Sequence, residues 1–238
     1  MGKPVRVVII DSGIDLKCPL LSKKVVASTG ILINEDGQLI NTLNPEVKNF
    51  HGSIIAGIIH NIGENVEFID INILNECLST DGRVLLHAFS RALQYKPDVI
   101  HLSLGTLSFR YYFALKRFVR MAQRNHVLIV AAADNNGRRS YPSHLNGVIG
   151  VKADPSKKLL QYSYKNGFFY APASVEGISG IERYTKVFNA YGSSMAAAYI
   201  TGHIVKDIYN EEMNDIDSCN DAYKMLKKYI KNRGRFYA

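Results

Sequence analysis

The chain has 238 residues, of which 47% are hydrophobic and 21% are charged, which suits a folded domain with a sizeable core and excludes a mainly disordered chain. Its longest apolar runs, such as 127–133, are too short for a membrane span, which needs roughly 20 residues. The net charge of +8 is compatible with an acidic partner, but the stacking aromatics and sequence modules of nucleic-acid-binding proteins are missing.

The N-terminus and the cysteines both indicate a chain that stays in a reducing compartment. The stretch MGKPVRVVII contains one short apolar run and no small-residue cleavage site, so we expect a cytoplasmic protein unless an upstream segment was removed. The cysteines, Cys18, Cys77 and Cys219, are widely spaced and odd in number, which predicts reduced thiols and no disulfide framework or metal site.

Short apolar runs alternate with helical patterns along the chain. Strands are predicted where the runs are rich in β-branched residues, at 5–10, 66–73, 98–104, 126–133 and 147–153. Helical spacing is found at 52–62, 82–95, 110–124 and 194–209, and a surface helix held by Tyr223, Leu226 and Ile230 is predicted at 218–234. The alternation predicts one α/β domain over 1–238, with a doubly wound, mostly parallel sheet and helices on both faces.

Two segments lack this regularity. Residues 19–50 carry turn signals at 36–37 and 44–45, which predict a hairpin or a long loop. Residues 154–192 are rich in Tyr, Phe, Gly and Ser, and we expect surface strands and substrate-facing loops there.

Much of the positive charge lies in two segments, 110–124 and 224–235. Both have the spacing of amphipathic helices whose charges face water. The alternative is a surface for an acidic protein or peptide.

Two of the four motifs that carry candidate chemistry lie in the first quarter of the chain. In IIDSGID, at 9–15, Asp11 stands at the carboxyl end of a buried strand, where open α/β sheets place their functional groups. Alone, it would equally suit a Mg²⁺ ligand or a turn cap. In HGSIIAGIIH, at 51–60, His51 precedes a helix of small and apolar residues, and His60 lies too far along for the two rings to share one face as metal ligands do.

The other two motifs lie further along. IVAAADNNGRRSYPS, at 129–143, is a buried strand that ends in an Asn-Asn-Gly turn, so Asn135 is either an amide donor at the strand end or an ordinary turn residue. In YGSSMAAAYITG, at 191–202, Ser194 lies in the first turn of a helix. There it either caps the helix or acts as a nucleophile beside backbone N–H groups.

Together the four motifs indicate a serine peptidase. A serine hydroxyl needs a histidine to accept its proton, and the histidine needs a carboxylate that fixes its tautomer. Asp11, His51 and Ser194 supply these groups, and Asn135 supplies a donor for the oxyanion of the tetrahedral intermediate. The order Asp, His, Ser along the chain is that of subtilisin and differs from the orders in α/β-hydrolases and chymotrypsin.

The motifs resemble those of the subtilases, the subtilisin-like family of serine peptidases. IIDSGID matches the Asp motif of the family, HGSIIAG its HGTxVAG-type His motif, and YGSSMAAAYITG its GTSMAxPxxxG-type Ser motif. AAADNNG is similar to the AAGN-type asparagine motif, and VIHLSLG, at 99–105, resembles the strand that pairs with the substrate backbone. The resemblance runs from about residue 5 to 209. It implies a subtilisin-like endopeptidase that needs no cofactor and binds a peptide or protein in extended form.

The resemblance also implies residues that bind substrate. Ser103, Leu104 and Gly105 would line one wall of the S1 pocket and hydrogen-bond to the substrate by strand addition. Asp134 replaces the glycine that usually precedes the oxyanion asparagine, so its carboxylate would lie near the S1 wall and favour Lys or Arg at P1. The alternative is that Asp134 turns away and caps a local turn.

Other departures from the family concern the size of the chain. Ala198 replaces the proline common in the serine helix, which the triad does not use, and the segment after His51 is too short for the calcium loop of secreted subtilases, so no strong calcium site is expected. Met1 closely precedes the first core strand, so no pro-domain is expected; the alternative is that such a segment is absent from this sequence. Such a chain resembles intracellular processing peptidases, including those that remove leader peptides.

Two other functions remain as alternatives. One is a catalytically silent scaffold of subtilase fold that binds peptides. The other is a nucleotide- or metal-dependent α/β enzyme that uses Asp11, although no phosphate-binding glycine loop follows the first strand.

Overall fold

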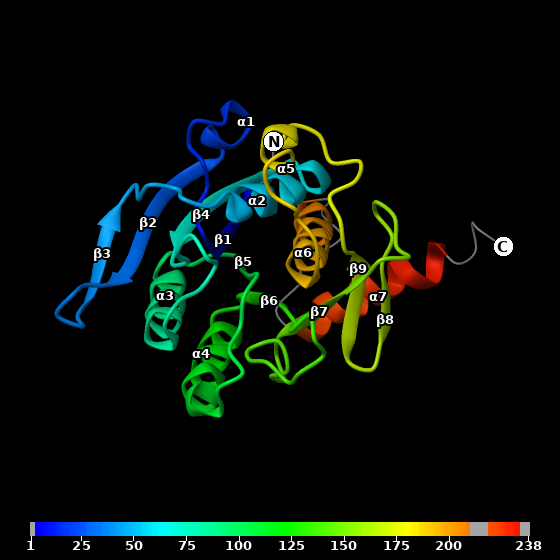
Figure 1. The fold of residues 1–238 in the computed structure, drawn as a ribbon. Coiled ribbons are helices and arrows are strands. Elements are labelled where there is room, and N and C mark those ends of the chain that lie inside the picture. Colours follow the sequence, from blue (N-terminus) through cyan, green and yellow to red (C-terminus); the bar gives the residue numbers. More distant parts are fainter. Residues whose placement is uncertain (1–2, 210–218, 234–238) are drawn as a thin grey trace.

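A nine-stranded sheet forms the centre of the computed structural model, which describes residues 3–209 and 219–233 (Figure 1). In spatial order its strands are β3 (Leu39–Leu43), β2 (Val25–Ile33), β4 (Val66–Asn72), β1 (Val5–Asp11), β5 (Val99–Leu102), β6 (Leu128–Ala132), β7 (Ile149–Asp154), β9 (Phe168–Pro172) and β8 (Ser163–Lys165). Neighbouring strands are parallel except at the two edges, where β3 and β8 are antiparallel to their partners. This confirms the predicted mostly parallel sheet.

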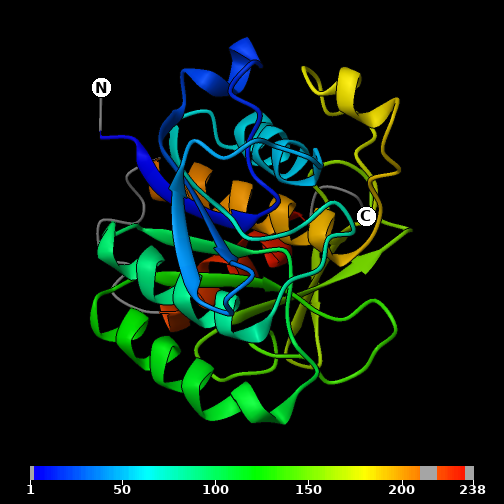
Figure 2. The same cartoon turned by 60° about the vertical axis from the view of Figure 1, so that its left-hand side comes forward.

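Helices cover both faces of the sheet (Figures 1 and 2). One face carries α2 (His51–Ile62), α6 (Ser193–Tyr209) and α7 (Cys219–Arg233), and the other carries α3 (Gly82–Gln94) and α4 (Tyr112–Arg124). The short helices α1 (Pro19–Ser22) and α5 (Glu182–Thr185) and the 3-10 turn η1 (Phe109–Tyr111) lie in connections. The doubly wound α/β fold class is therefore confirmed.

The strands are apolar throughout because each of their faces is buried against a helical layer. In β1, Val7 and Ile9 belong to the core under α2 and α6, whereas Val8 and Ile10 belong to the core under α3 and α4. All four side chains are fully buried. Alternation between two cores explains why the sequence shows continuous apolar runs instead of an alternating pattern.

The two irregular segments differ in how well they were predicted. Residues 25–43 form the expected hairpin of β2 and β3, and β2 also pairs in parallel with β4. The expectation of surface strands in 154–192 is wrong for β9, which pairs in parallel with β7 and buries Phe169 and Ala171 completely. β9 is short and follows a glycine turn, so nothing local distinguishes it from a surface hairpin.

The helix predicted near the C-terminus is α7. Leu226 is fully buried, and the Tyr223 hydroxyl donates a hydrogen bond to the Val148 carbonyl at 3.1 Å; the side chain of Ile230 lies outside the described residues. Cys18 is a buried free thiol and Cys77 an exposed one, while Cys219 also has no described side chain. Within 3–209 and 219–233, the helices lack the length and apolarity that a membrane crossing requires.

Candidate active site

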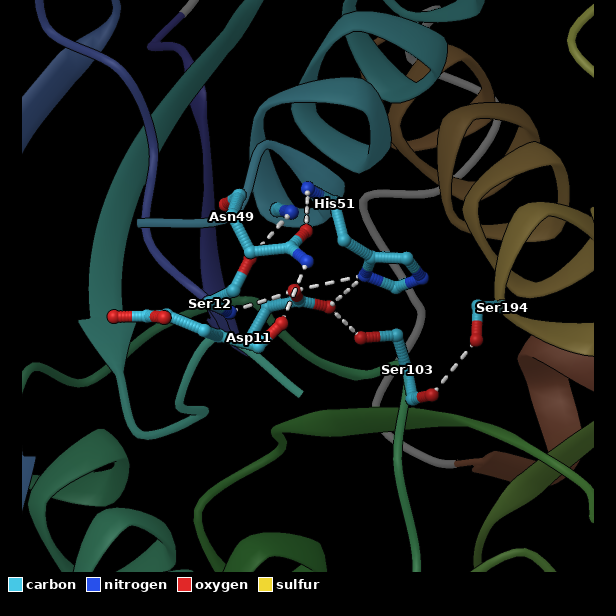
Figure 3. Close-up of polar contacts among 8 residues, drawn as sticks. Asp11, Ser12, Asn49, His51, Ser103 and Ser194 are labelled. Carbon is cyan, nitrogen blue, oxygen red and sulfur yellow. Dashed lines mark hydrogen bonds and ion pairs between the residues drawn. The ribbon is translucent and has the colours of Figure 1, made fainter. Parts of the chain in front are cut away.

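Asp11 lies at the carboxyl end of β1, fully buried, and both its oxygens accept hydrogen bonds (Figure 3). The Ser12 backbone N–H donates to Oδ1 at 2.6 Å, and the Ser103 hydroxyl donates to Oδ2 in a short contact. The His51 ring nitrogen Nδ1 lies 2.8 Å from Oδ1 and 2.9 Å from Oδ2. The predicted Asp11–His51 pair is therefore formed in the structure.

The electrostatics of this pair fix the tautomer of the ring. Burial opposes ionisation of Asp11, but the His51 ring and the Ser12 N–H outweigh it and lower the pKa of the carboxyl. Burial likewise opposes a charge on His51, but Asp11 outweighs it and raises the pKa of the imidazole. Nδ1 therefore carries the proton that Asp11 accepts, and Nε2 is left as a basic nitrogen on the opposite side of the ring.

His51 is held at the start of α2 by residues that the sequence analysis missed. The Asn49 side chain accepts the His51 backbone N–H at 2.9 Å. The Ser12 hydroxyl donates to the Asn49 carbonyl at 2.8 Å and accepts the Gly52 N–H at 3.0 Å. A Cβ at Gly52 would lie 2.6 Å from the Gly13 carbonyl oxygen, so only glycine lets α2 come this close to the Asp11 loop. Asn49 precedes the N-cap residue Phe50, and its bond to the N–H two residues on is an Asx turn, a frequent local role of Asn.

The ring of His51 is also covered by an aromatic side chain. Phe188, from the connection between α5 and α6, meets it edge to face with ring centroids 5.8 Å apart. No local pattern in 154–192 marks this residue. Its contact restricts the orientations that the imidazole can adopt.

Ser194 occupies the second position of α6, beside the His51 ring. Its hydroxyl donates to the Ser103 carbonyl at 2.8 Å. Figure 3 shows the second nitrogen of the His51 ring pointing toward Ser194. The structure thus places all three predicted triad residues together, with the serine hydroxyl turned to a backbone oxygen.

Ser103 makes two contacts within the protein in addition to its predicted pairing with substrate. Its side chain donates to Asp11 and its carbonyl accepts from Ser194, so one residue at the end of β5 contacts both ends of the predicted triad. After it, Leu104 packs partly into the core under α3 and α4. Thr106 then pairs in antiparallel fashion with Tyr141.

Asn135 follows β6 and docks onto the start of α6. Its side-chain oxygen accepts the Ser193 backbone N–H at 2.8 Å. An N–H can only donate, so this contact orients the amide and leaves the Nδ2 hydrogens available as donors beside Ser194. Gly192 has a φ of +120°, and a Cβ there would lie 2.9 Å from both amide atoms of Asn135. Glycine therefore allows the close approach of the two loops.

Asp134 lies in a local turn, which favours the second of the two interpretations of this residue. Its carboxylate accepts from Arg138 through Nη2 at 2.8 Å and Nε at 3.1 Å. It also accepts the backbone N–H groups of Asn136 at 3.0 Å and Arg138 at 3.1 Å. The hydrogen bonds from Arg138 lower the pKa of Asp134 to about 2. The Asp134 carboxylate is thus already paired with the guanidinium of Arg138 in the same turn.

A second carboxyl group is buried beside Asp11. In the sheet, Ile9 of β1 pairs with Asp70 of β4 on one side and with His101 of β5 on the other. The side chains of Asp70 and His101 are fully buried. The Ser28 hydroxyl donates to Asp70 at 2.8 Å, yet burial raises the pKa of this carboxyl to about 7. Burial lowers the pKa of His101 to about 4, so its ring is neutral and contacts the Thr201 hydroxyl at 2.9 Å.

Asp70 should make the stability of the fold depend on pH. Its folded pKa of about 7 exceeds the ordinary value of about 3.9, so the folded state binds more protons between these values and stability falls as the pH rises from about 4 to about 7. As the pH rises from about 4 to about 7, the unfolding free energy of the wild type should fall by on the order of 3 kcal/mol more than that of Asp70→Asn. Urea denaturation at a series of pH values measures the difference, with the exposed Asp36→Asn as control. A variant that keeps the wild-type pH dependence would contradict the assignment.

The chain is similar to known peptidases. The profile of the subtilase family matches residues 2–215. The chain is 27% identical over 216 residues to the major intracellular serine protease of Bacillus subtilis (strain 168), covering 84% of this chain and 67% of that protein. It is 30% identical over 220 residues to subtilisin DY of Bacillus licheniformis, covering 84% and 75%. The crystal structure of a lanthipeptide protease has the same fold, with a TM-score of 0.68 at 22% identity over 95% of this chain and 80% of that one.

Proposed function

The chain belongs to the subtilase family and is a subtilisin-like serine endopeptidase, and on this premise we propose that Asp11, His51 and Ser194 form its catalytic triad. The observation that carries the proposal is the buried Asp11–His51 hydrogen bond, with the free ring nitrogen directed toward Ser194. Three elements distant in sequence, the ends of β1, α2 and α6, meet to make this arrangement.

The reaction begins when the Ser194 hydroxyl turns from the Ser103 carbonyl to Nε2 of His51. Its oxygen attacks the scissile carbonyl carbon while His51 takes the proton, and Asp11 stabilises the imidazolium. The oxyanion accepts hydrogen bonds from the Asn135 side chain and from the backbone at the start of α6. His51 then gives its proton to the leaving amine, the C–N bond breaks, and water hydrolyses the acyl-enzyme by the same steps.

We further propose that the substrate binds as an added strand along Ser103, Leu104 and Gly105. The backbone of this segment leads away from the contact between Ser103 and Ser194, so a substrate paired with it has its scissile bond at the nucleophile. Main-chain hydrogen bonds supply affinity in this mode, and side-chain pockets supply specificity.

The preference for Lys or Arg at P1 depends on whether Asp134 is free. Because Arg138 holds the carboxylate, we expect Arg138→Ala to raise kcat/KM for P1 Lys or Arg, relative to P1 Leu, by about 3- to 10-fold. Matched fluorogenic peptides that differ only at P1 measure this ratio. The double variant Asp134→Asn/Arg138→Ala should return it to the wild-type value. An unchanged ratio in Arg138→Ala would show that Asp134 does not reach the S1 pocket.

We propose a processing role inside the cell, in which the enzyme cuts a defined peptide or leader sequence. Two observations support it: one relative is named an intracellular serine protease, and one structural neighbour is named a lanthipeptide protease. The alternative is a silent peptide-binding scaffold. A fluorophosphonate probe should label the wild type at Ser194 and leave Ser194→Ala unlabelled, and mass spectrometry of cleaved peptide libraries should then reveal the sites. A folded protein that takes up no label and cleaves nothing would support the scaffold.

A further inference from the structure

The segment that follows the substrate-pairing strand exposes an unusual group of apolar side chains. Leu107, Phe109 and Phe113 are 43%, 60% and 70% exposed. The rings of Phe109 and Tyr112 are stacked with centroids 5.0 Å apart, and Phe113 meets them edge to face at 5.9 Å and 5.2 Å. Tyr141 closes the group, 5.1 Å from Tyr112. We call these five residues the aromatic cluster. Tyr141 is buried and Tyr112 is half-buried, so Leu107, Phe109 and Phe113 are its exposed part, and exposed apolar side chains gathered in one region of a surface mark an interaction site.

The aromatic cluster continues the strand on which the substrate is proposed to bind. Ser103 contacts the nucleophile through its carbonyl, and three residues later Thr106 pairs with Tyr141 of the cluster. An extended chain advances about 3.3 Å per residue, so a substrate that runs antiparallel to 103–105 would reach the cluster about four to six residues upstream of the scissile bond.

A stripe of cations extends the cluster along α4. Phe113, Arg117, Arg120 and Arg124 follow one another at intervals of four, three and four residues, so they share one helix face, and all are exposed. The opposite face of α4 packs into the core through Leu115, Val119 and Ala122. Figures 1 and 2 both show α4 on the outside of the molecule, with one side turned away from the other elements.

The charges of this stripe are not balanced locally. Residues 99–133 contain no Asp or Glu. Within the part of the chain that the structure describes, Arg117, Arg120 and Arg124 form no ion pair. Neighbouring like charges repel one another, so an anionic ligand on this face relieves the repulsion and is drawn to it from solution.

We propose that the aromatic cluster and the Arg117–Arg120–Arg124 face of α4 form an exosite for the upstream part of the substrate. It takes an acidic peptide segment whose aromatic or leucine side chain packs into the cluster and whose Asp and Glu residues pair with the arginines. A peptide fits better than RNA because the face prolongs a peptide-binding strand. The proposal rests on the proposed function, since it assumes that substrate pairs with Ser103–Gly105.

Matched quenched-fluorescent peptides test the exosite. All of the peptides share the same cleavable sequence. Upstream of it, each peptide carries a Phe together with either Glu residues or Gln residues. We expect the Glu peptide to have about 10-fold higher kcat/KM in the wild type at low salt, through KM, and added salt to reduce the difference. The variant Arg117→Glu/Arg120→Glu should bring the ratio of the two peptides to about 1 or below. The charge-matched control Lys158→Glu/Lys165→Glu, at and near the edge strand β8, should keep the wild-type ratio.

A binding measurement separates failure of the exosite from failure of the proposed function. Fluorescence anisotropy with Ser194→Ala and the labelled Glu extension reports binding without cleavage, and Phe113→Ser should weaken it several-fold. If the fluorophosphonate probe does not label Ser194 and no peptide is cleaved, the proposed function is wrong. The anisotropy assay still tests whether the exosite binds the peptide, because it does not require cleavage. A wild-type ratio near 1, an equal loss in the lysine control, or tighter binding of a uridine oligonucleotide at the same arginines would overturn the exosite.

Discussion

Replacing Ser194 by alanine is expected to lower kcat about 10⁶-fold, and His51→Ala should have an effect of the same size, because either change removes covalent catalysis as a whole. Asp11→Asn should lower kcat about 10⁴-fold, since the asparagine keeps the shape of the side chain but no longer fixes the His51 tautomer or stabilises the imidazolium. A double variant of Ser194 and His51 should be little worse than either single variant, because the residues act as a unit.

Cleavage of a peptide identified by substrate profiling, followed under single-turnover conditions, measures these losses. Ser156→Ala is the matched control, since this serine lies on an exposed turn and its hydroxyl bonds to Asp154, away from the triad residues. Circular dichroism checks that each variant is folded. Residual activity of more than about 1% in Ser194→Ala would contradict a nucleophilic role for this serine.

The second large effect is expected at Asn135. Its amide is the proposed side-chain donor to the oxyanion, and loss of such a donor in subtilisin costs about 10²–10³ in kcat. We expect Asn135→Ala to show a loss of this order, with little change in KM, because the hydrogen bond strengthens only as the oxyanion forms. Steady-state kinetics on one good peptide substrate measures both constants.

Asn135 also accepts the Ser193 N–H, so alanine removes two contacts at once. Asn135→Asp separates them: the carboxylate keeps the acceptor that docks α6 but has no hydrogen to donate. The Asp variant should therefore keep most of the thermal stability of the wild type and still lose catalysis. An Asp variant with wild-type kcat would exclude Asn135 from the oxyanion site.

The core of the fold and the site could be predicted because they depend on local signals. The five predicted central strands are buried on both faces, so each appears as an apolar run whatever its neighbours are. Asp11, His51 and Ser194 each lie at the end of such a run or at the start of a helix, and their order along the chain indicates the chemistry. In the structure Asp11 and His51 are hydrogen-bonded and the other ring nitrogen points toward Ser194, while their catalytic roles stay a prediction.

What could not be predicted depends on contacts between distant segments. The hydroxyl of Ser103 reaches Asp11 across 92 positions of sequence, and no pattern near either residue signals it. Phe188 covers the His51 ring from a connection with no regular structure. The spacing of Asp134 and Arg138 permits an ion pair, but whether the carboxylate faces the turn or the S1 pocket is decided by the three-dimensional path of the turn.

The two bonds of Ser103 have a consequence for the timing of catalysis. A substrate that adds as a strand needs the Ser103 carbonyl as an acceptor, and at rest the Ser194 hydroxyl occupies that oxygen. On the proposed mode of binding, the incoming main chain competes with the hydroxyl for this oxygen, and the His51 ring is the acceptor toward which the hydroxyl would turn. If the proposed triad and binding mode hold, substrate binding and activation of the Ser194 hydroxyl would be coupled, because both involve the Ser103 carbonyl.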